Sequence, residues 1–387
     1  MNNPEIKLSS LVMLAICLFT TLPVVGQVDY FPPKGAWEMR DPANLKVDAQ
    51  KLQAAVEFAL GNEYSGSIDL RQAILKGFQR EPYHKILGPT KKRGGPAGLI
   101  VKNGYIIAQW GEPDRVDMTF SVTKSYLSTV AGLAVDKDLI ASVDDQVLKY
   151  VWDGTFEGEH NSSITWDHLL TQSSDWSGSL WGTPDWADRP PRTGGIDDWK
   201  NRQLLQPGTN FEYNDVRVNV LAYSLLQVWR KPLPDVLKQC IMDPIGASST
   251  WRWFGYENSW VNVDGVKVQS VSGGGHSGGG VFINTYDHAR FGLLFLNKGN
   301  WNGQQLISKE WIDQVKMSSK ANASYGYMWW LNRGERKWDD LSENIYYAAG
   351  FGGNFIVVDE EHDLILVTRW LEPSKIGELV GMIIDSL

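Results

Sequence analysis

Apolar residues recur along this chain with two different periods, and the periods separate strand-forming parts from helix-forming parts. Residues 97–102 and 105–110 are apolar, β-prone runs joined by Asn103-Gly104, a dipeptide typical of a two-residue hairpin turn. Three further runs of this kind lie near the C-terminus, at residues 346–349, 354–358 and 364–370. The pattern therefore predicts strands near both ends of the chain.

Between these strands, apolar residues recur at intervals of three and four, which is the spacing of one face of a helix. This spacing predicts helices at residues 48–60, 121–134, 166–170, 216–229, 286–298 and 309–317, with a last helix near Pro373. Thr165, Thr285 and Ser308 each precede one of these segments and are the expected N-caps.

The order of strands, helices, strands and a final helix is typical of an α+β fold. We expect the first and last segments to share one antiparallel sheet flanked by helices. The length of 387 residues and the hydrophobic content of 43% suffice for one large core. The expected organisation is a domain over residues 48–387, with a mostly helical subdomain at about 136–245, preceded by an irregular segment at 27–47.

Residues 1–26 have the pattern of an export signal. Lys7 is followed by an apolar run at 11–22 and by small residues at 24–26, which form a cleavage site. We expect a periplasmic or secreted protein with no stable membrane span after cleavage, because the apolar run is short for a span. A buried first helix is the alternative. Cleavage would leave Cys240 as the single cysteine, so no internal disulfide is expected.

The charge balance narrows the range of partners. The formal net charge is −8, and the chain has no long basic run. Nucleic acids and anionic membranes attract proteins of the opposite charge balance. We therefore expect no nucleic-acid partner.

Ser121 and Lys124 open the predicted helix at 121–134 and form an S-x-x-K pair. Residues three apart share one face of a helix, so the hydroxyl and the ammonium group should lie side by side. A serine becomes a nucleophile when a neighbouring base takes its proton, and a lysine can be that base if its surroundings lower its pKa. Because such a pair also arises by chance in most chains of this length, it needs support from other segments.

Two further segments could complete such a site. Tyr213 lies in a loop before the helix at 216–229, where its hydroxyl could enter a cleft and relay a proton. Small residues at 347–353 end a strand, and a main-chain N–H group there could join that of Ser121 in an oxyanion hole. The alternatives are a packed structural tyrosine and a simple tight turn.

In this order the three segments resemble the serine β-lactamase and penicillin-binding-protein superfamily, which carries S-x-x-K, then Y-x-N, then K-T-G on a C-terminal strand. The likeness spans about residues 48–385 and includes I-T-W-D-H-L-L-T-Q-S-S at 164–174, P-G-T at 207–209 and P-I-G at 244–246. It implies a β-lactamase/transpeptidase-like fold and a serine hydrolase. The esterase and 6-aminohexanoate-oligomer hydrolase branches are the most similar, because they also lack the lysine of the third motif.

The resemblance also implies roles for individual residues. Ser121 would be the acylated nucleophile, and Lys124 the general base or its partner. Tyr213 would be the proton relay. The amides of Ser121 and Phe351 would form the oxyanion hole.

The chain departs from the family pattern at two positions. Ala348, Ala349 and Gly350 stand where β-lactamases carry K-T-G, so the groups that hold a substrate carboxylate are missing. We expect these three residues to contact the substrate and β-lactam turnover to be poor. Asp215 replaces the asparagine of Y-x-N. It could pair with Lys124, bind a cationic substrate group, or cap the following helix.

His276 lies in a Gly-rich stretch at 272–280 and imitates a variant of the third motif. Because this stretch precedes a helix and not a terminal strand, we expect a loop that lines the cleft. The six histidines show no ligand spacing such as H-E-x-x-H, so the sequence predicts no metal site and no cofactor. Two Trp-rich groups, at 176–199 and 251–260, suggest a cleft with aromatic walls.

Together these patterns predict an exported serine hydrolase that cleaves a small ester, amide or short peptide-like substrate through an acyl-enzyme at Ser121. One alternative is a cell-wall D-Ala peptidase or a β-lactamase. Another is a non-catalytic binding or scaffolding relative, although the presence of Ser121, Lys124 and Tyr213 argues against it.

Overall fold

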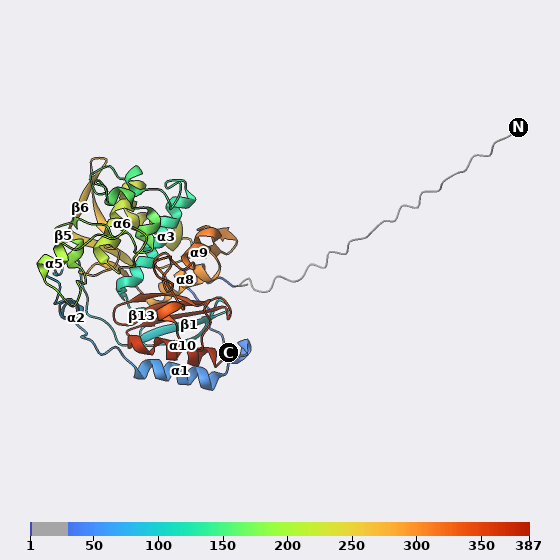
Figure 1. The fold of residues 1–387 in the computed structure, drawn as a ribbon. Coiled ribbons are helices and arrows are strands. Elements are labelled where there is room, and N and C mark those ends of the chain that lie inside the picture. Colours follow the sequence, from blue (N-terminus) through green and yellow to red (C-terminus); the bar gives the residue numbers. More distant parts are fainter. Residues whose placement is uncertain (2–29) are drawn as a thin grey trace.

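The computed structural model describes residues 1 and 30–387 and has the α+β arrangement expected from the sequence (Figure 1). The predicted export signal, which contains Cys17, lies outside the described residues apart from Met1. Among the helices that are described, none is long and apolar enough to cross a membrane.

A six-stranded sheet joins the two ends of the chain. Its strand order is β11-β12-β13-β14-β1-β2, and every neighbouring pair is antiparallel. The strands are β1 (Ala97–Lys102), β2 (Tyr105–Trp110), β11 (Trp330–Leu331), β12 (Tyr346–Gly350), β13 (Asn354–Asp359) and β14 (Leu364–Arg369). Ala97 in β1 lies opposite Arg369 in β14, which confirms that the first and last segments share one sheet.

Helices cover both faces of this sheet because its strands are apolar on both sides. In Figure 1, α1 (Ala49–Gly61) and α10 (Ile376–Ile384) lie along one face and α8 (Thr285–Leu296) lies on the other. Successive strand residues point to opposite faces. Ile100 therefore packs in the cluster of α1 and α10, while Leu99 and Val101 pack in the cluster that contains α8.

Most of the remaining helices form the part of the molecule above the sheet in Figure 1, and α2 (Leu70–Gly77) lies to the left of the sheet. The others are α3 (Thr123–Asp136), α4 (Trp166–Leu170), α5 (Ile196–Lys200), α6 (Asp215–Trp229), α7 (Leu233–Leu237) and α9 (Lys309–Val315). Helix α3 is buried from Thr123 to Ala134 and contacts α6, α7 and β12. It therefore lies between the helical part and the sheet.

A second sheet supports the start of α3. Its order is β3-β8-β6-β7, with β3 (Asp117–Met118), β6 (Arg252–Val263), β7 (Val266–Val271) and β8 (Gly280–Ile283). Two small hairpins pair β4 (Ser179–Leu180) with β5 (Thr183–Pro184) and β9 (Asn300–Trp301) with β10 (Gln304–Gln305). The Thr119 amide donates to the Val281 carbonyl, and the Val281 amide donates to Thr123 Oγ1. These bonds fix the segment around Ser121 against β8.

Single helical turns complete the chain. They are η1 (Pro42–Leu45), η2 (Phe120–Val122), η3 (Val147–Lys149), η4 (Asn161–Ser163), η5 (Asp185–Ala187), η6 (Lys238–Met242), η7 (Gly334–Arg336) and η8 (Pro373–Lys375). Thr165 and Ser308 cap α4 and α9 as expected. The expected cap at Thr285 is wrong, because Asn284 accepts from the Asp287 amide and Thr285 is already helical. Neither α2 nor β8 was expected from the sequence.

Candidate active site

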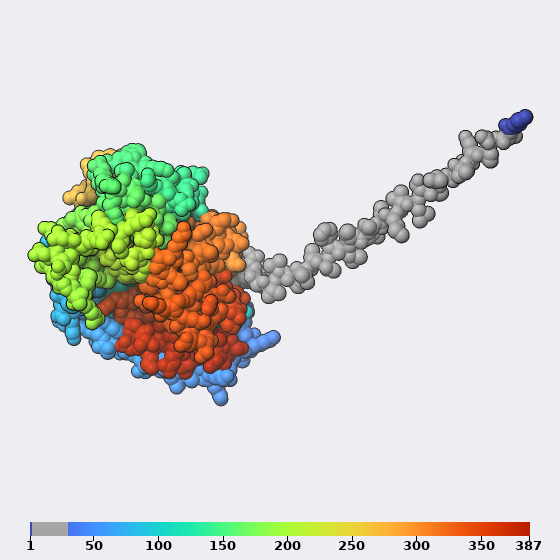
Figure 2. Space-filling model, in the orientation of Figure 1, coloured from blue at the N-terminus to red at the C-terminus, as the bar shows by residue number. Residues whose placement is uncertain are grey.

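A cleft of about 710 Å³ runs between the end of β12 and the helical part, and Ser121 lies in its wall. Tyr213, Asp215 and His276 also line it, as do Gly350 and Phe351. Figure 2 shows the yellow-green surface of the helical part directly against the orange and red surface of the C-terminal part of the chain. The cleft therefore brings together residues from distant parts of the sequence.

Ser121 is held in η2 by a strained neighbour. Phe120 has a φ of 49°, a backbone conformation that bulky residues rarely adopt and that costs about 1–3 kcal/mol. Its ring is buried 5.1 Å from the Phe351 ring and 6.4 Å from the Trp370 ring, measured between centroids. This aromatic packing holds the turn in a conformation that presents Ser121 to the cleft.

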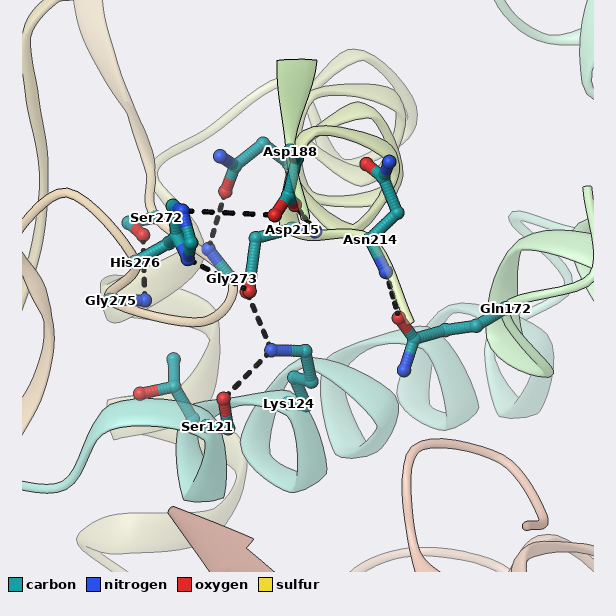
Figure 3. Close-up of polar contacts among 12 residues, drawn as sticks. Ser121, Lys124, Gln172, Asp188, Asn214, Asp215, Ser272, Gly273, Gly275 and His276 are labelled. Atoms are coloured by element: carbon teal, nitrogen blue, oxygen red, sulfur yellow. Dashed lines mark hydrogen bonds and ion pairs between the residues drawn. The ribbon is translucent and has the colours of Figure 1, made fainter. Parts of the chain in front are cut away.

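Lys124 lies beside Ser121, as the S-x-x-K spacing requires (Figure 3). Its Nζ is 3.0 Å from Ser121 Oγ and 2.6 Å from Asp215 Oδ1, and its side chain is only 1% exposed. Burial by itself lowers the pKa of Lys124, but the charge of Asp215 and the Tyr213 hydroxyl outweigh burial and leave the pKa above its ordinary value. Lys124 is therefore an ammonium ion that donates to Ser121 Oγ in this state.

Asp215 is the first residue of α6, and its carboxylate is shared between two cations. Oδ1 contacts Lys124, and Oδ2 lies 2.6 Å from an Arg189 guanidinium nitrogen. Burial alone would raise the pKa of Asp215, but these two cations hold it well below its ordinary value. The capping interpretation of Asp215 is wrong, because Asn214 is the N-cap and accepts from the Arg217 amide.

Gly274 brings the Gly-rich loop directly onto the buried pair. A Cβ placed on Gly274 would overlap the Asp215 carboxylate and the Lys124 ammonium group. The loop is fixed there by two hydrogen bonds, from the Gly273 amide to Asn219 Oδ1 (2.9 Å) and from the Gly275 amide to Ser272 Oγ (2.9 Å). The loop thus covers one side of the Lys124–Asp215 pair, and position 274 requires glycine because no side chain fits there.

Tyr213 presents its ring, and not its hydroxyl, to Lys124. The Lys124 Nζ lies 4.5 Å from the ring centroid, and Trp330 stacks on the ring at 5.7 Å. Within the described residues, no hydrogen bond joins the Tyr213 hydroxyl to Ser121 or Lys124. Gln172, in the turn after α4, positions this segment by accepting from the Asn214 amide and from the Glu212 amide.

The end of β12 lies against the backbone of Ser121. A Cβ on Gly350 would overlap the Thr119 carbonyl and come within 3.3 Å of the Ser121 amide nitrogen. Ala349, Gly350 and Phe351 line the cleft. Ala348 does not, because strand alternation turns it into the core on the α3 and α8 side, where it is 1% exposed. The expectation that Ala348 contacts the substrate is therefore wrong.

His276 lines the cleft from the Gly-rich loop, but it lies behind Asp215. Its Nε2 is 2.6 Å from Glu81 Oε2, and its Nδ1 is 3.2 Å from an Arg189 nitrogen and 3.5 Å from Asp215 Oδ2. His276 thus contacts a partner of Lys124 and not Ser121 itself.

The structure adds two residues that sequence reasoning missed. Arg189 pairs with both Asp188 and Asp215, and Asp188 accepts from the amides of Asp215 and Val216. Asp188 and Arg189 are adjacent in the loop at 188–195, which carries no periodic pattern. An adjacent acid and base in a loop is too common a pattern to mark a site by itself.

The cleft has aromatic walls, but not from the expected segments. Its aromatic lining consists of Tyr64, Phe78, Phe120, Phe211, Tyr213, Trp330, Trp338, Tyr347, Phe351 and Phe355. Of the two Trp-rich groups, Trp251 and Trp253 are buried in the core, and Trp260 is largely exposed. Neither group contributes to the lining of the cleft.

Comparison with known proteins gives the family. Residues 89–369 match the sequence profile of the family described as Beta-lactamase. A relative from Escherichia coli O157:H7, provisionally named a D-alanyl-D-alanine carboxypeptidase, is 22% identical over 70% of this chain and 76% of its own. The 6-aminohexanoate-dimer hydrolase of Paenarthrobacter ureafaciens is 23% identical over 72% and 73% of the two chains.

Solved structures agree on the fold. A family VIII carboxylesterase superimposes with a TM-score of 0.55 at 15% identity, covering 87% of this chain and 97% of its own. The chain therefore belongs to the beta-lactamase family and has its α+β fold. It is a serine hydrolase of that family.

Proposed function

We propose that this protein is an exported esterase or amidase that forms an acyl-enzyme at Ser121. The observation that carries the proposal is the contact of Lys124 Nζ with Ser121 Oγ at 3.0 Å, inside a cleft that Gly350 and Phe351 also line. Ser121 Oγ attacks the carbonyl carbon of the substrate, the leaving alcohol or amine departs, and water then releases the acid. The amides of Ser121 and Phe351 stabilise the oxyanion in both steps.

The charged state of Lys124 determines the route of the proton. An ammonium ion donates a hydrogen bond to Ser121 Oγ and stabilises negative charge there, but it cannot accept the hydroxyl proton. We assign the transfer to Tyr213, whose ring lies against Lys124: the Tyr213 oxygen takes the Ser121 proton while its own hydroxyl proton passes to the leaving alcohol or amine. The hydroxyl must approach Ser121 when substrate binds, because catalytic hydrogen bonds often tighten only in the substrate complex.

The substrate is a small ester or amide with an apolar acyl part. The cleft is walled by aromatic rings next to Ser121, and no lysine stands at 348–350 to hold a carboxylate. Removing a charged partner that a carboxylate needs costs about 2–5 kcal/mol. Penicillins should therefore acylate this enzyme poorly.

A peptidase that accepts a free carboxylate is the second candidate, and Arg336 favours it. Its guanidinium lies 4.1 Å from the centroid of the Trp330 ring and lines the cleft. It could take over the role of the missing lysine from another segment. The provisional name of the Escherichia coli relative belongs to this class of activity.

One panel of substrates tests both candidates. Purified protein is incubated with a fluorophosphonate and with labelled penicillin and read by intact mass. It is then assayed with p-nitrophenyl butyrate, 6-aminohexanoate dimer, nitrocefin and a D-Ala-D-Ala peptide. We expect fluorophosphonate labelling and ester hydrolysis. Efficient nitrocefin or D-Ala-D-Ala hydrolysis without esterase activity would reverse the order of the candidates, and no labelling at all would contradict the acyl-enzyme.

A further inference from the structure

Glu81, His84 and His276 form a buried cluster beside Asp215, on the side of its carboxylate that faces away from Lys124. Glu81 Oε2 lies 2.6 Å from His276 Nε2 and 3.8 Å from His84 Nδ1. One possible ligand atom from each residue lies within 4.8 Å of the other two. The three side chains are 7%, 3% and 8% exposed, in that order. The proposed hydrolysis makes no use of Glu81 or His84.

His84 is the unexplained member of this cluster. In the part of the chain that the structure describes, neither of its ring nitrogens has a hydrogen-bond partner, although the side chain is buried. A neutral imidazole without a hydrogen-bond partner has a lone pair that a metal ion can take.

The charges around the cluster also favour a cation. Three carboxylates, those of Glu81, Asp188 and Asp215, face the two cations Lys124 and Arg189. A buried excess of negative charge is costly unless another positive group offsets it. A bound metal ion or a protonated imidazole would supply that charge.

The two segments that carry the cluster are fixed to each other. The amides of Leu87 and Gly88 donate to the Ser277 carbonyl, and the Gly279 amide donates to the Pro89 carbonyl. A cavity of about 30 Å³ adjoins all three residues of the cluster, which is room for one ion or one water molecule. The three side chains therefore line a small cavity between two segments that are hydrogen-bonded to each other.

We propose that Glu81, His84 and His276 bind a divalent transition-metal ion of the zinc type. Two imidazoles and one carboxylate are a donor set that suits such ions and leaves one position open for water. Zinc–ligand distances near 2.1 Å place tetrahedral ligand atoms roughly 3.4 Å apart, so side-chain shifts of less than about 1 Å complete the site. Sequence spacing could not predict it, because Glu81 and His84 lie far from His276 in the chain.

Metal binding would also change the proton on His276. Nε2 would bind the ion, so Nδ1 would carry the ring proton. Nδ1 lies 3.2 Å from an Arg189 nitrogen and 3.5 Å from Asp215 Oδ2, so a protonated Nδ1 would give up the contact with Arg189 and donate to Asp215. The result would be a carboxylate–histidine–metal arrangement, in which the carboxylate orients the ligating ring. Asp215 would then connect the metal site to Lys124.

Calorimetry on the full chain tests the site directly. Chelator-stripped protein is titrated with Zn²⁺, and the absorption spectrum of Co²⁺ bound in its place reports the ligand geometry. We expect one equivalent to bind. Loss of an outer partner already weakens metal binding about 10–100-fold, so His84→Gln and Glu81→Gln should each weaken it by at least about 100-fold. His362→Asn is the matched control, because His362 pairs with Asp359 in the β13–β14 turn and should leave binding unchanged.

A second measurement keeps the test decisive if a variant does not fold. In the wild-type chain with isotope-labelled histidines, one equivalent of Zn²⁺ should shift the NMR signals of the ring nitrogens of two histidines. The ring-nitrogen signals of the other histidines should not change. The absence of one-equivalent binding by the wild type would overturn the proposal. Binding that His84→Gln leaves unchanged would also overturn it, because the ion would then sit on other residues.

Discussion

Two buried charge clusters meet at the first turn of α6, and they differ in how completely they are satisfied. Asp215 belongs to the cluster at the cleft. Arg217, two residues later, belongs to a cluster outside it, where one guanidinium nitrogen lies 2.8 Å from Asp175 and 3.1 Å from Asp185 and another lies 2.8 Å from Glu212. The third nitrogen donates to a backbone carbonyl. Every buried polar side-chain atom of Arg217, Asp175 and Asp185 therefore has a hydrogen-bond partner.

The cluster at the cleft lacks this completeness. Among the described residues, both ring nitrogens of His84 are buried without a hydrogen-bond partner, and Asp215 Oδ2 has an ion pair with Arg189 at 2.6 Å but no hydrogen bond of normal geometry. A fully satisfied network stabilises one conformation, whereas unpaired buried groups cost free energy and persist where chemistry or a ligand uses them. The comparison indicates that Arg217 stabilises the fold and that Asp215 takes part in the chemistry of the site. Four changes test this division, from the largest expected effect to the smallest.

Ser121→Ala should separate chemistry from stability most clearly. Removal of a serine nucleophile lowers turnover by roughly 10⁶-fold in other serine hydrolases, and we expect the same scale here. The protein should still fold, because the change removes only a hydroxyl group and the hydrogen bond that it accepts from Lys124. Steady-state kinetics and fluorophosphonate labelling give the readout. A variant with a tenth of wild-type turnover would exclude Ser121 as the nucleophile.

Arg217→Met should show the opposite behaviour. Breaking a buried ion pair by removing one partner typically costs about 3–5 kcal/mol, because the remaining carboxylates stay buried and unpaired. We expect that loss in the free energy of unfolding in urea, with unchanged turnover for each folded molecule. The control is Arg230→Met, which breaks an exposed pair with Asp264 and should change stability little. A folded Arg217→Met protein without activity would place Arg217 in the site.

Gly274→Ala tests whether the loop and the Lys124–Asp215 pair are one unit. The added methyl group would overlap both charged groups, so either the pair or the loop must shift. A displacement of about 1 Å near the reacting atoms can cost roughly 100-fold in rate, and we expect a fall in kcat of that size. Gly195→Ala is the control, because nothing lies within 4 Å of its Cβ position. Equal activity of both variants would show that the pair tolerates movement.

Asp215→Asn should change the pH dependence of the rate more than its maximum. The carboxylate raises the pKa of Lys124 against the effect of burial, so its loss lets the pKa of Lys124 fall. Because the proposed reaction uses Lys124 as an ammonium ion, the basic limb of the kcat/KM profile should move to lower pH. An unchanged profile with every substrate would show that the pairing does not tune the reaction.

The same variant should also alter stability in acid. The folded-state pKa of Asp215 is depressed, so its contribution to stability is complete above its unfolded pKa of about 3.9 and is lost as the pH falls below that value. The wild type should therefore lose stability between about pH 5 and pH 2 more steeply than Asp215→Asn. Urea midpoints across this range measure the difference. Parallel curves would mean that Asp215 is not held as a buried anion.

Sequence patterns predicted the sheet well because its strands are long, apolar and bounded by turn residues. The bounds of β1 and β2 agree with the predicted runs, and Asn103 and Gly104 both have positive φ in the turn between them. By contrast, α2 and β8 are short, and their patterns are too brief for a period to be recognised. Their positions depend on contacts with distant segments.

The site was predictable only where it is local. Ser121 and Lys124 are three residues apart, so helix geometry alone places them together. Asp188 and Arg189 come from an irregular loop, and the need for glycine at 274 depends on a contact made in the folded chain. The motif order and resemblance indicated Tyr213, but the face that it turns toward Lys124 is set by the stacking of Trp330. No spacing along the chain encodes these contacts.

The pairing of β1 with β14 has a consequence for how the molecule is made. Ala97 and Arg369 are neighbours in the sheet but are separated by most of the chain, so their loop closes late and at a high entropic cost. During synthesis, a chain that ends before β14 leaves one edge of β1 and one edge of β13 unpaired. The strand that presents Gly350 to Ser121 then lacks its support. A nascent chain therefore acquires hydrolytic activity only when its last strand is in place, and folding should be slow for a protein of this length.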